Sequence, residues 1–221
     1  MTSPSPFVKM HMCLDKEANR EAKRSIALGK AEAEIDVSAA EAVAWYWDFC
    51  SNERMRMNKE KGYPARLVMT KSEHSTSTSM GTRRDVVVEP THPPTTQLLL
   101  AHSLRSLAGS NDALFATVRV LNFFVWNREF VARSIFTKDD ESGAVTVAQD
   151  STDDIIDYGT STWTVRGSTR VLFTAVPIAN DRSKVTFVQL LDAGGNIPAW
   201  IMNRSVKKQL GMVENIRDAF Q

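Results

Sequence analysis

The fold is decided by Val185-Thr186-Phe187-Val188-Gln189-Leu190-Leu191-Asp192-Ala193-Gly194-Gly195-Asn196-Ile197-Pro198-Ala199-Trp200. Residues 184–192 are rich in apolar and β-branched side chains and predict a strand. Gly194-Gly195-Asn196 predicts a turn, and Pro198 is tolerated in the first turn of a helix. The stretch therefore predicts a strand, a turn and a helix in direct succession.

One long helix is predicted from this turn almost to the end of the chain. Its apolar residues recur every three or four positions and form one stripe: Met202, Val206, Leu210, Val213, Ile216 and Phe220. Some twenty residues would span about 30 Å, enough to cross a curved sheet. The basic residues beside the stripe (Arg204, Lys207, Lys208) predict a solvated face or, alternatively, a contact with an anionic membrane surface.

Consecutive strands with short turns are predicted upstream of this stretch. Apolar or alternating runs lie at about 114–125, 129–136, 144–150, 160–167 and 168–178, separated by turn-like breaks. Such an order is typical of an antiparallel meander.

The first helix and the strand before it are predicted from a separate signal. Ile26 to Val37 alternates between apolar and charged residues, as expected of a half-buried strand. Ser38 followed by Glu41 predicts a capping box that opens a helix at about 39–50. The segment from 51 to 112 has a poorer pattern, with strands expected at 65–70 and 84–89. The chain is therefore α+β, with helices on one side of an antiparallel sheet.

Composition narrows the class of protein. Of the 221 residues, 43% are hydrophobic, which allows a substantial core, and 27 basic residues nearly balance 26 acidic ones. A nucleic-acid-binding domain would normally be strongly basic, so no nucleic-acid partner is expected. Two cysteines are too few for a disulfide framework and predict reduced thiols in the cytoplasm. No secretory signal and no membrane span is predicted.

Catalytic and metal-binding motifs are absent from the sequence. The four histidines lack metal-ligand spacing, and no nucleophile elbow, P-loop or dinucleotide-binding fingerprint occurs. We therefore expect no catalytic residue, no metal and no cofactor, and a protein that is not an enzyme.

Four stretches in order resemble the START domain family. They are Ile35 to Cys50, which is similar to the family's strand-into-helix entry; Trp126 to Val131; Val165-Arg166-Gly167; and Val185 to Trp200. The resemblance implies a helix-grip fold, in which a curved antiparallel sheet wraps around a long C-terminal helix and encloses a cavity. It implies a START-like domain over 26–221, with an N-terminal extension over 1–25 and an irregular insertion at about 71–112.

Function follows from the resemblance as an expectation. START domains generally bind one sterol, phospholipid or similar apolar ligand, so we expect a lipid partner in the cavity, for intracellular transfer or sensing. Transient membrane contact is compatible with this reading, and Trp126 and Trp200 are candidates for it or for buried packing. Two alternatives stay open: a helix-grip enzyme acting on an apolar substrate, and a regulatory or scaffold domain with a vestigial cavity. The oligomeric state is left open.

The candidate ligand-binding residues lie on the last helix and on the strands before it. They are Met202, Val206, Leu210, Val213, Phe187, Gln189, Phe173, Arg166 and Arg128. The helix stripe can equally be ordinary core, and Arg128 and Arg166 can equally be structural. A cavity of a few hundred Å³ beneath the helix would support ligand binding, whereas direct packing of Met202, Val206 and Leu210 on the sheet would argue against it.

Overall fold

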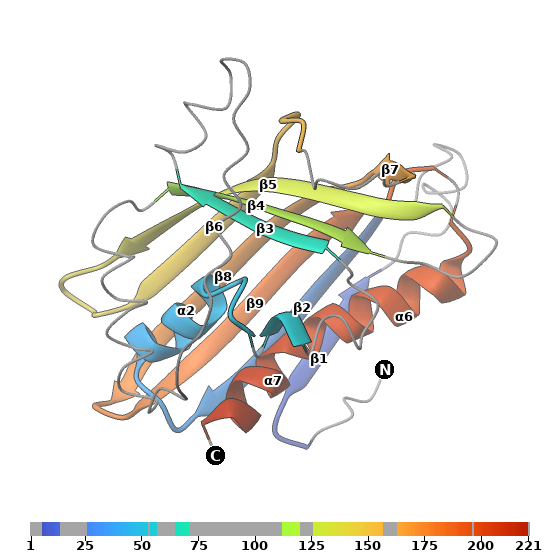
Figure 1. Ribbon diagram of the computed structural model, residues 1–221. Coiled ribbons are helices and arrows are strands. Elements are labelled where there is room, and N and C mark those ends of the chain that lie inside the picture. The colour runs from blue at the N-terminus through green and yellow to red at the C-terminus, as the bar shows by residue number, and fades with distance from the viewer. Residues whose placement is uncertain are drawn as a thin grey trace.

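The computed structural model describes residues 6–13, 26–52, 54–56, 65–70, 112–119, 126–156, 163–195 and 197–220 (Figure 1). Nine strands of this part form one sheet in the order β1-β2-β9-β8-β6-β5-β4-β3, with β7 beside β5. All pairs are antiparallel except β5 with β7. The strands are β1 (Lys9–Cys13), β2 (Ile26–Ile35), β3 (Ala65–Thr70), β4 (Asp112–Arg119), β5 (Asn127–Lys138), β6 (Val145–Ser151), β7 (Thr164–Arg166), β8 (Ser168–Ala179) and β9 (Arg182–Asp192).

The longer helices of this part are α2 (Ala39–Trp47), α6 (Ala199–Leu210) and α7 (Met212–Ala219), and residues 54–56 are also helical. All three lie on one side of the sheet, α2 against β6, β8 and β9, and α6 and α7 against β2 (Figure 1). The α+β class and the helix-grip arrangement predicted from the sequence are confirmed.

Most predicted strands are present with small shifts at their ends. In β2, Ala31, Ala33 and Ile35 are buried and the charged residues between them are not, as the alternation predicts. The strand expected at 84–89 lies outside the described residues, as does the expected insertion at 71–112 apart from Asp112, which begins β4. Within the segment 1–25, residues 9–13 form β1 and pair with β2 at the edge of the sheet.

The predicted capping box opens α2. Ser38 accepts a hydrogen bond from the backbone N–H of Glu41, and the Glu41 carboxylate accepts one from the backbone N–H of Ser38. The helix ends at Trp47 rather than at residue 50, because Asp48 leaves the helical conformation with φ −70° and ψ 62°. The shorter helix still buries Val43, Tyr46 and Trp47 against the sheet.

The single C-terminal helix expected from the sequence is two helices in the structure. Gly211, with ψ −4°, separates α6 from α7. A glycine in a helix interior lowers helix stability by about 1 kcal/mol relative to alanine, so Gly211 is the residue between α6 and α7 that favours the helix least. Both helices pack against β2, and α7 also contacts α2 and β9.

Small side chains on β2 let α6 approach closely. The buried positions at the start and middle of this strand are Ala27, Gly29 and Ala31. A Cβ atom at Gly29 would lie 3.0 Å from both Val206 Cγ1 and Leu210 Cδ2. Gly29 is therefore the contact point at which the helix touches the sheet.

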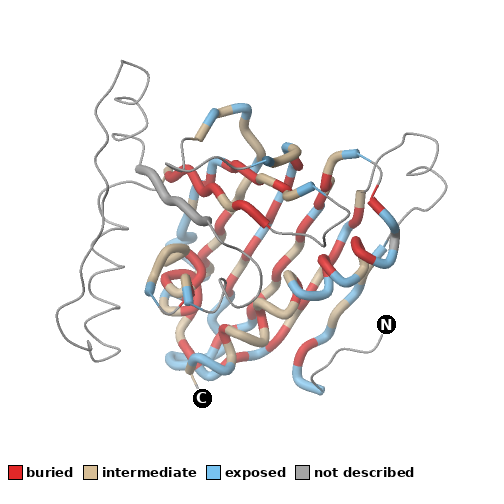
Figure 2. The backbone as a smooth tube through the Cα atoms, turned by 45° about the vertical axis from the view of Figure 1, so that its right-hand side comes forward, coloured by how far each residue is buried: buried red, intermediate tan, exposed pale blue. Residues whose placement is uncertain are grey.

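The turn between β9 and α6 is built as the sequence predicts. Gly194 and Gly195 have φ values of 69° and 63°, a left-handed conformation that glycine adopts without a Cβ penalty. The Asp192 carboxylate accepts a hydrogen bond from the Gly194 N–H at 3.0 Å, which fixes the turn. Most buried residues of the sheet and helices, coloured red in Figure 2, form one core, and Leu114, Ala116 and Val131 form a second, smaller cluster.

Candidate functional site

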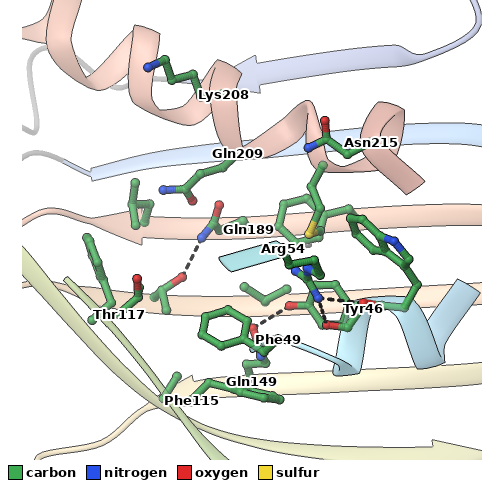
Figure 3. A pocket seen from close by; sticks show the side chains of 18 residues that line it. Tyr46, Phe49, Arg54, Phe115, Thr117, Gln149, Gln189, Lys208, Gln209 and Asn215 are labelled. Atoms are coloured by element: carbon green, nitrogen blue, oxygen red, sulfur yellow. Dashed lines mark hydrogen bonds between the residues drawn. The ribbon is translucent and has the colours of Figure 1, made fainter. Parts of the chain in front are cut away.

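A cavity of about 170 Å³ lies between the inner face of the sheet and the helices (Figure 3). Strands β4, β5, β6, β8 and β9 form its floor, and α2, α6 and α7 contribute its other walls. The lining residues are Trp45, Tyr46, Phe49, Arg54, Phe115, Thr117, Phe130, Ala132, Gln149, Thr169, Val171, Phe187, Gln189, Leu191, Lys208, Gln209, Met212 and Asn215. The cavity is smaller than the few hundred Å³ expected and below the usual range of about 300–1,000 Å³ for ligand pockets.

Strand alternation and register explain which residues of the sheet face the cavity. Phe115 in β4 pairs with Ala132 in β5, and Val171 in β8 pairs with Gln189 in β9. Side chains two apart on one strand share a face, so these pairs bring alternate residues of several strands to the same inner surface. Ala132, with its single methyl group, sits among larger side chains and leaves space above the sheet.

Aromatic rings form one side of the cavity. Tyr46 stacks on Phe173 with ring centroids 4.4 Å apart, and its hydroxyl donates to Gln149 Oε1 at 2.7 Å. Phe49 packs against Phe115 at 4.8 Å. Helix α2 is thereby held on the sheet by ring contacts and by one partly buried hydrogen bond.

Arg54 is a buried cation in the cavity wall. Its Nη1 donates to the carbonyl oxygens of Trp45, Tyr46 and Asp48 at 2.7, 2.6 and 3.2 Å. Its guanidinium also lies 4.4 Å from the ring centroid of Trp45. Burial lowers the pKa of Arg54 to about 10, so the group is charged at neutral pH. The side chain satisfies carbonyls at the end of α2 and makes this end of the cavity electropositive.

Gln189 is one of four polar residues in the floor of the cavity, with Thr117, Gln149 and Thr169. Its Nε2 donates to Thr169 Oγ1 at 2.9 Å, a diagonal contact between neighbouring strands. Within the described part of the chain, Gln189 Oε1 has no hydrogen-bond partner and is buried. An unsatisfied buried acceptor generally costs about 1–3 kcal/mol.

Two of the nine candidate residues from the sequence line this cavity: Phe187 and Gln189. Phe173 lies beneath Tyr46 and is fully buried. Met202 and Arg128 border a separate void of about 10 Å³, too small for a ligand. Val206, Leu210 and Val213 are core residues.

Direct packing of the predicted stripe on the sheet, which was expected to argue against ligand binding, is found for Val206 and Leu210, so this stripe is not a wall of the cavity. The last helices turn another face to the cavity. Val206 and Leu210 pack on Gly29 of β2, and the adjacent residues Lys208, Gln209 and Met212 border the cavity instead. The reason is that the most apolar stripe takes the driest position, against the small side chains of β2. The face of the helices that borders the cavity is therefore amphipathic, and its Lys208 is exposed.

The two candidate arginines are structural. Arg128 donates from Nε to the Ala193 carbonyl at 2.5 Å and from Nη2 to the Gly194 carbonyl at 3.2 Å, which ties β5 to the β9–α6 turn. Burial lowers its pKa. Arg166 pairs with Glu129 at 3.1 Å and donates to the carbonyls of Thr152 and Asp154, outside the cavity.

Several lining residues were not predicted. Thr117, Gln149 and Thr169 are polar residues at inward positions of β4, β6 and β8, a signal present in the alternation of each strand. Tyr46 falls on the buried face of α2. Arg54 carries no such signal, since it is a single arginine in a stretch with poor periodicity.

Exposed tryptophans gather near one end of the sheet. Trp126 and Trp163 precede β5 and β7, and their ring centroids are 5.9 Å apart. Trp200 lies in the first turn of α6, and β7 and the start of α6 lie near the same end in Figure 1. Trp126 and Trp200 are 60% and 59% exposed, so neither is packed in the core. No helix in the described ranges is long and apolar enough to cross a bilayer.

Comparison with known proteins identifies the fold. A STAR-related lipid transfer protein from Xanthomonas axonopodis matches with a TM-score of 0.63 and 16% identity, covering 99% of this chain and 96% of that one. The human StarD13 (DLC2) lipid transfer and protein localization domain matches with a TM-score of 0.61 and 13% identity, covering 100% and 87%. Human STARD10 matches with a TM-score of 0.59 and 12% identity, covering 98% and 69%.

Sequence comparison adds nothing to this result, since no protein-family model and no curated protein matches the chain. The chain has the START-like helix-grip fold, as the four sequence stretches predict. At these identities the likeness describes the fold alone.

Proposed function

We propose that the protein binds one apolar molecule, or the apolar part of one lipid, in the cavity between the sheet and the helices. The observation that carries this proposal is the cavity of about 170 Å³ with largely aromatic and aliphatic walls. Protein interiors are otherwise close-packed, so a space of this size on the inner face is a candidate binding site. Each methylene transferred into it from water contributes about 0.8 kcal/mol.

The proposed activity is binding alone, without catalysis. The described wall contains no carboxylate, histidine or cysteine side chain, and these are the commonest acids, bases and nucleophiles of enzymes. Tyr46 and Arg54, its buried ionisable residues, are hydrogen-bonded to Gln149 and to backbone carbonyls. The known START-like structures, named for lipid transfer, support the same reading.

Native mass spectrometry tests the proposal. The purified protein is incubated with a total lipid extract, exchanged into volatile buffer and examined for a one-to-one complex, and the bound molecule is extracted and identified. We expect a stoichiometric apolar ligand recovered unchanged. A ligand recovered as a reaction product would support the enzyme alternative, and a protein that takes up nothing would support the scaffold alternative.

Ala132→Phe locates the bound molecule. The added ring would occupy the cavity floor, so uptake should fall at least about tenfold, because a few buried methylenes account for that factor. Ala148→Phe is the matched control, since Ala148 lies one position from Gln149 and therefore on the opposite face of β6. Circular dichroism should show both variants folded. Equal uptake by the wild type and Ala132→Phe would exclude this cavity as the site.

Transfer or sensing would require the protein to meet a membrane. The exposed indoles of Trp126, Trp163 and Trp200 support transient contact, because tryptophan favours the membrane–water interface. A cytoplasmic location stays the expectation drawn from the sequence.

A further inference from the structure

Gln189 and the size of the cavity together define a narrower ligand class. We propose that the ligand is an uncharged, ring-sized apolar molecule with one hydroxyl group, a phenol or small alcohol, whose hydroxyl donates to Gln189 Oε1. This inference rests on the proposed function, because it concerns the same cavity. It is carried by the buried amide and the volume, not by the fold.

The amide of Gln189 supplies the polar end of the site. The side chain is only 7% exposed, Nε2 is engaged with Thr169, and Oε1 lacks a partner among the described residues. Figure 3 shows Gln189 in the cavity floor, with Gln209 reaching toward it from α6. A ligand donor is thus the group that completes the site, and a hydroxyl can also accept from a neighbouring amide.

The basic side chains in the cavity wall favour a hydroxyl over an ammonium group as the hydrogen-bond donor of the ligand. Arg54 and Lys208 are the charged side chains of the described wall, and both are basic. An ammonium group would be repelled by them, and its burial without a carboxylate would be costly. A neutral hydroxyl avoids both penalties.

Volume and wall chemistry set the size of the apolar part. A cavity of about 170 Å³ is close to the roughly 150 Å³ of an engineered apolar cavity that binds benzene. Phe49, Phe115 and Phe187 line it and offer edges and faces to a single ring. The part of a larger molecule that does not fit would lie outside the cavity, on the side of the exposed Lys208.

The experiment compares para-ethylphenol with ethylbenzene, which differ by one hydroxyl group. In a purely apolar cavity the hydroxyl weakens binding, since it loses its hydrogen bonds to water. With Gln189 as acceptor, we expect para-ethylphenol to bind the wild type about tenfold more tightly, as one hydrogen bond allows. Titration calorimetry or NMR chemical shifts measure both dissociation constants.

The double variant Gln189→Leu/Thr169→Val assigns the preference to the amide. It removes both partners of the buried hydrogen bond, so neither is left unsatisfied, and it should bind ethylbenzene as well as the wild type does while losing the preference for para-ethylphenol. Should the double variant fail to fold, Gln189→Glu serves instead. The carboxylate keeps the shape of the side chain and should change the ratio of the dissociation constant of para-ethylphenol to that of ethylbenzene.

The remaining outcomes separate the two proposals. Ethylbenzene binding that equals or exceeds para-ethylphenol binding in the wild type would overturn the hydroxyl assignment and leave apolar binding in place. Tighter binding of para-ethylbenzoate than of para-ethylphenol would also overturn it, in favour of an anion beside Arg54. If neither neutral probe binds and Ala132→Phe changes nothing in the lipid-uptake assay, both proposals fail.

Discussion

Arg128 shows how one side chain holds two distant parts of the fold together. Its guanidinium donates to the carbonyls of Trp126, Ala193 and Gly194, at the start of β5 and in the turn before α6. The side chain is buried, so these contacts are shielded from water. The residue therefore sets where α6 begins.

Arg128→Met tests this role. The variant keeps much of the side-chain volume but removes the hydrogen bonds that the charged guanidinium donates to four carbonyls, so we expect the free energy of unfolding to fall by at least about 2 kcal/mol. Urea denaturation followed by tryptophan fluorescence measures it. Arg170→Met is the control, because Arg170 forms an exposed pair with Asp150, and such pairs contribute at most about 1 kcal/mol. Equal losses in the two variants would contradict a structural role for Arg128.

Gln189 differs from Arg128 in that its polar group is only half satisfied. The hydroxyls of Ser134 and Ser183 are also buried without a partner among the described residues, but of these three groups only Gln189 lines the cavity. This contrast is the reason for assigning Arg128 to the scaffold and Gln189 to the site.

At the scale of elements, the contact between β2 and α6 decides which helix face meets the cavity. Val206 and Leu210 meet the backbone at Gly29, which turns Lys208, Gln209 and Met212 toward the open space. A larger residue on β2 would lift or rotate the helix.

Gly29→Val tests the helix–strand contact. The new side chain would overlap Val206 and Leu210, so we expect a loss of about 1–3 kcal/mol in the free energy of unfolding. Leu210→Ala alone should cost about 2–5 kcal/mol, since it leaves a cavity. The double variant should lose less than the sum, by at least about 0.5 kcal/mol, because the valine fills the space that alanine opens.

Leu28→Val provides the control for the same strand. Leu28 is exposed on the outer face, so its substitution should change stability by no more than about 0.5 kcal/mol. Strictly additive losses in Gly29→Val and Leu210→Ala would mean that the two positions do not share a contact.

At the scale of the whole molecule, two groups of exposed apolar side chains differ in their chemistry. Trp126 and Trp163 lie side by side before β5 and β7, and Leu28, Leu172 and Leu190 lie on the outer face of the sheet. Only the first contains indoles, whose polar N–H and apolar body suit an interface between water and lipid.

Trp126→Ser/Trp163→Ser tests membrane contact. We expect the wild type to sediment with vesicles of phosphatidylcholine and phosphatidylserine, and the double variant to partition at least about tenfold less, since two indoles leave the interface. Leu172→Ser/Leu190→Ser removes exposed apolar surface elsewhere and should sediment like the wild type. Equal partitioning of the two double variants would exclude the tryptophan surface.

The sequence by itself determined the features that depend on neighbouring residues. The alternation of β2, the Ser38–Glu41 capping box and the Asp192–Gly195 turn each involve contacts within a few positions of the chain or one face of one strand. The order of these elements predicted the α+β class, and the resemblance of four stretches to START domains implied the helix-grip fold. Of the residues named as ligand-binding candidates, Phe187 and Gln189 line the cavity, and their role in binding stays a prediction.

Only the tertiary structure decided where the cavity lies and which residues line it. Periodicity shows that a helix has an apolar stripe but not whether that stripe meets a strand or an open space. Here the answer depends on Gly29, whose missing side chain lets Val206 and Leu210 touch β2. Arg54, Gln149 and Gln209 also line the cavity. They come from three separate parts of the chain, and the packing of these parts, not the local sequence of any one of them, brings them together.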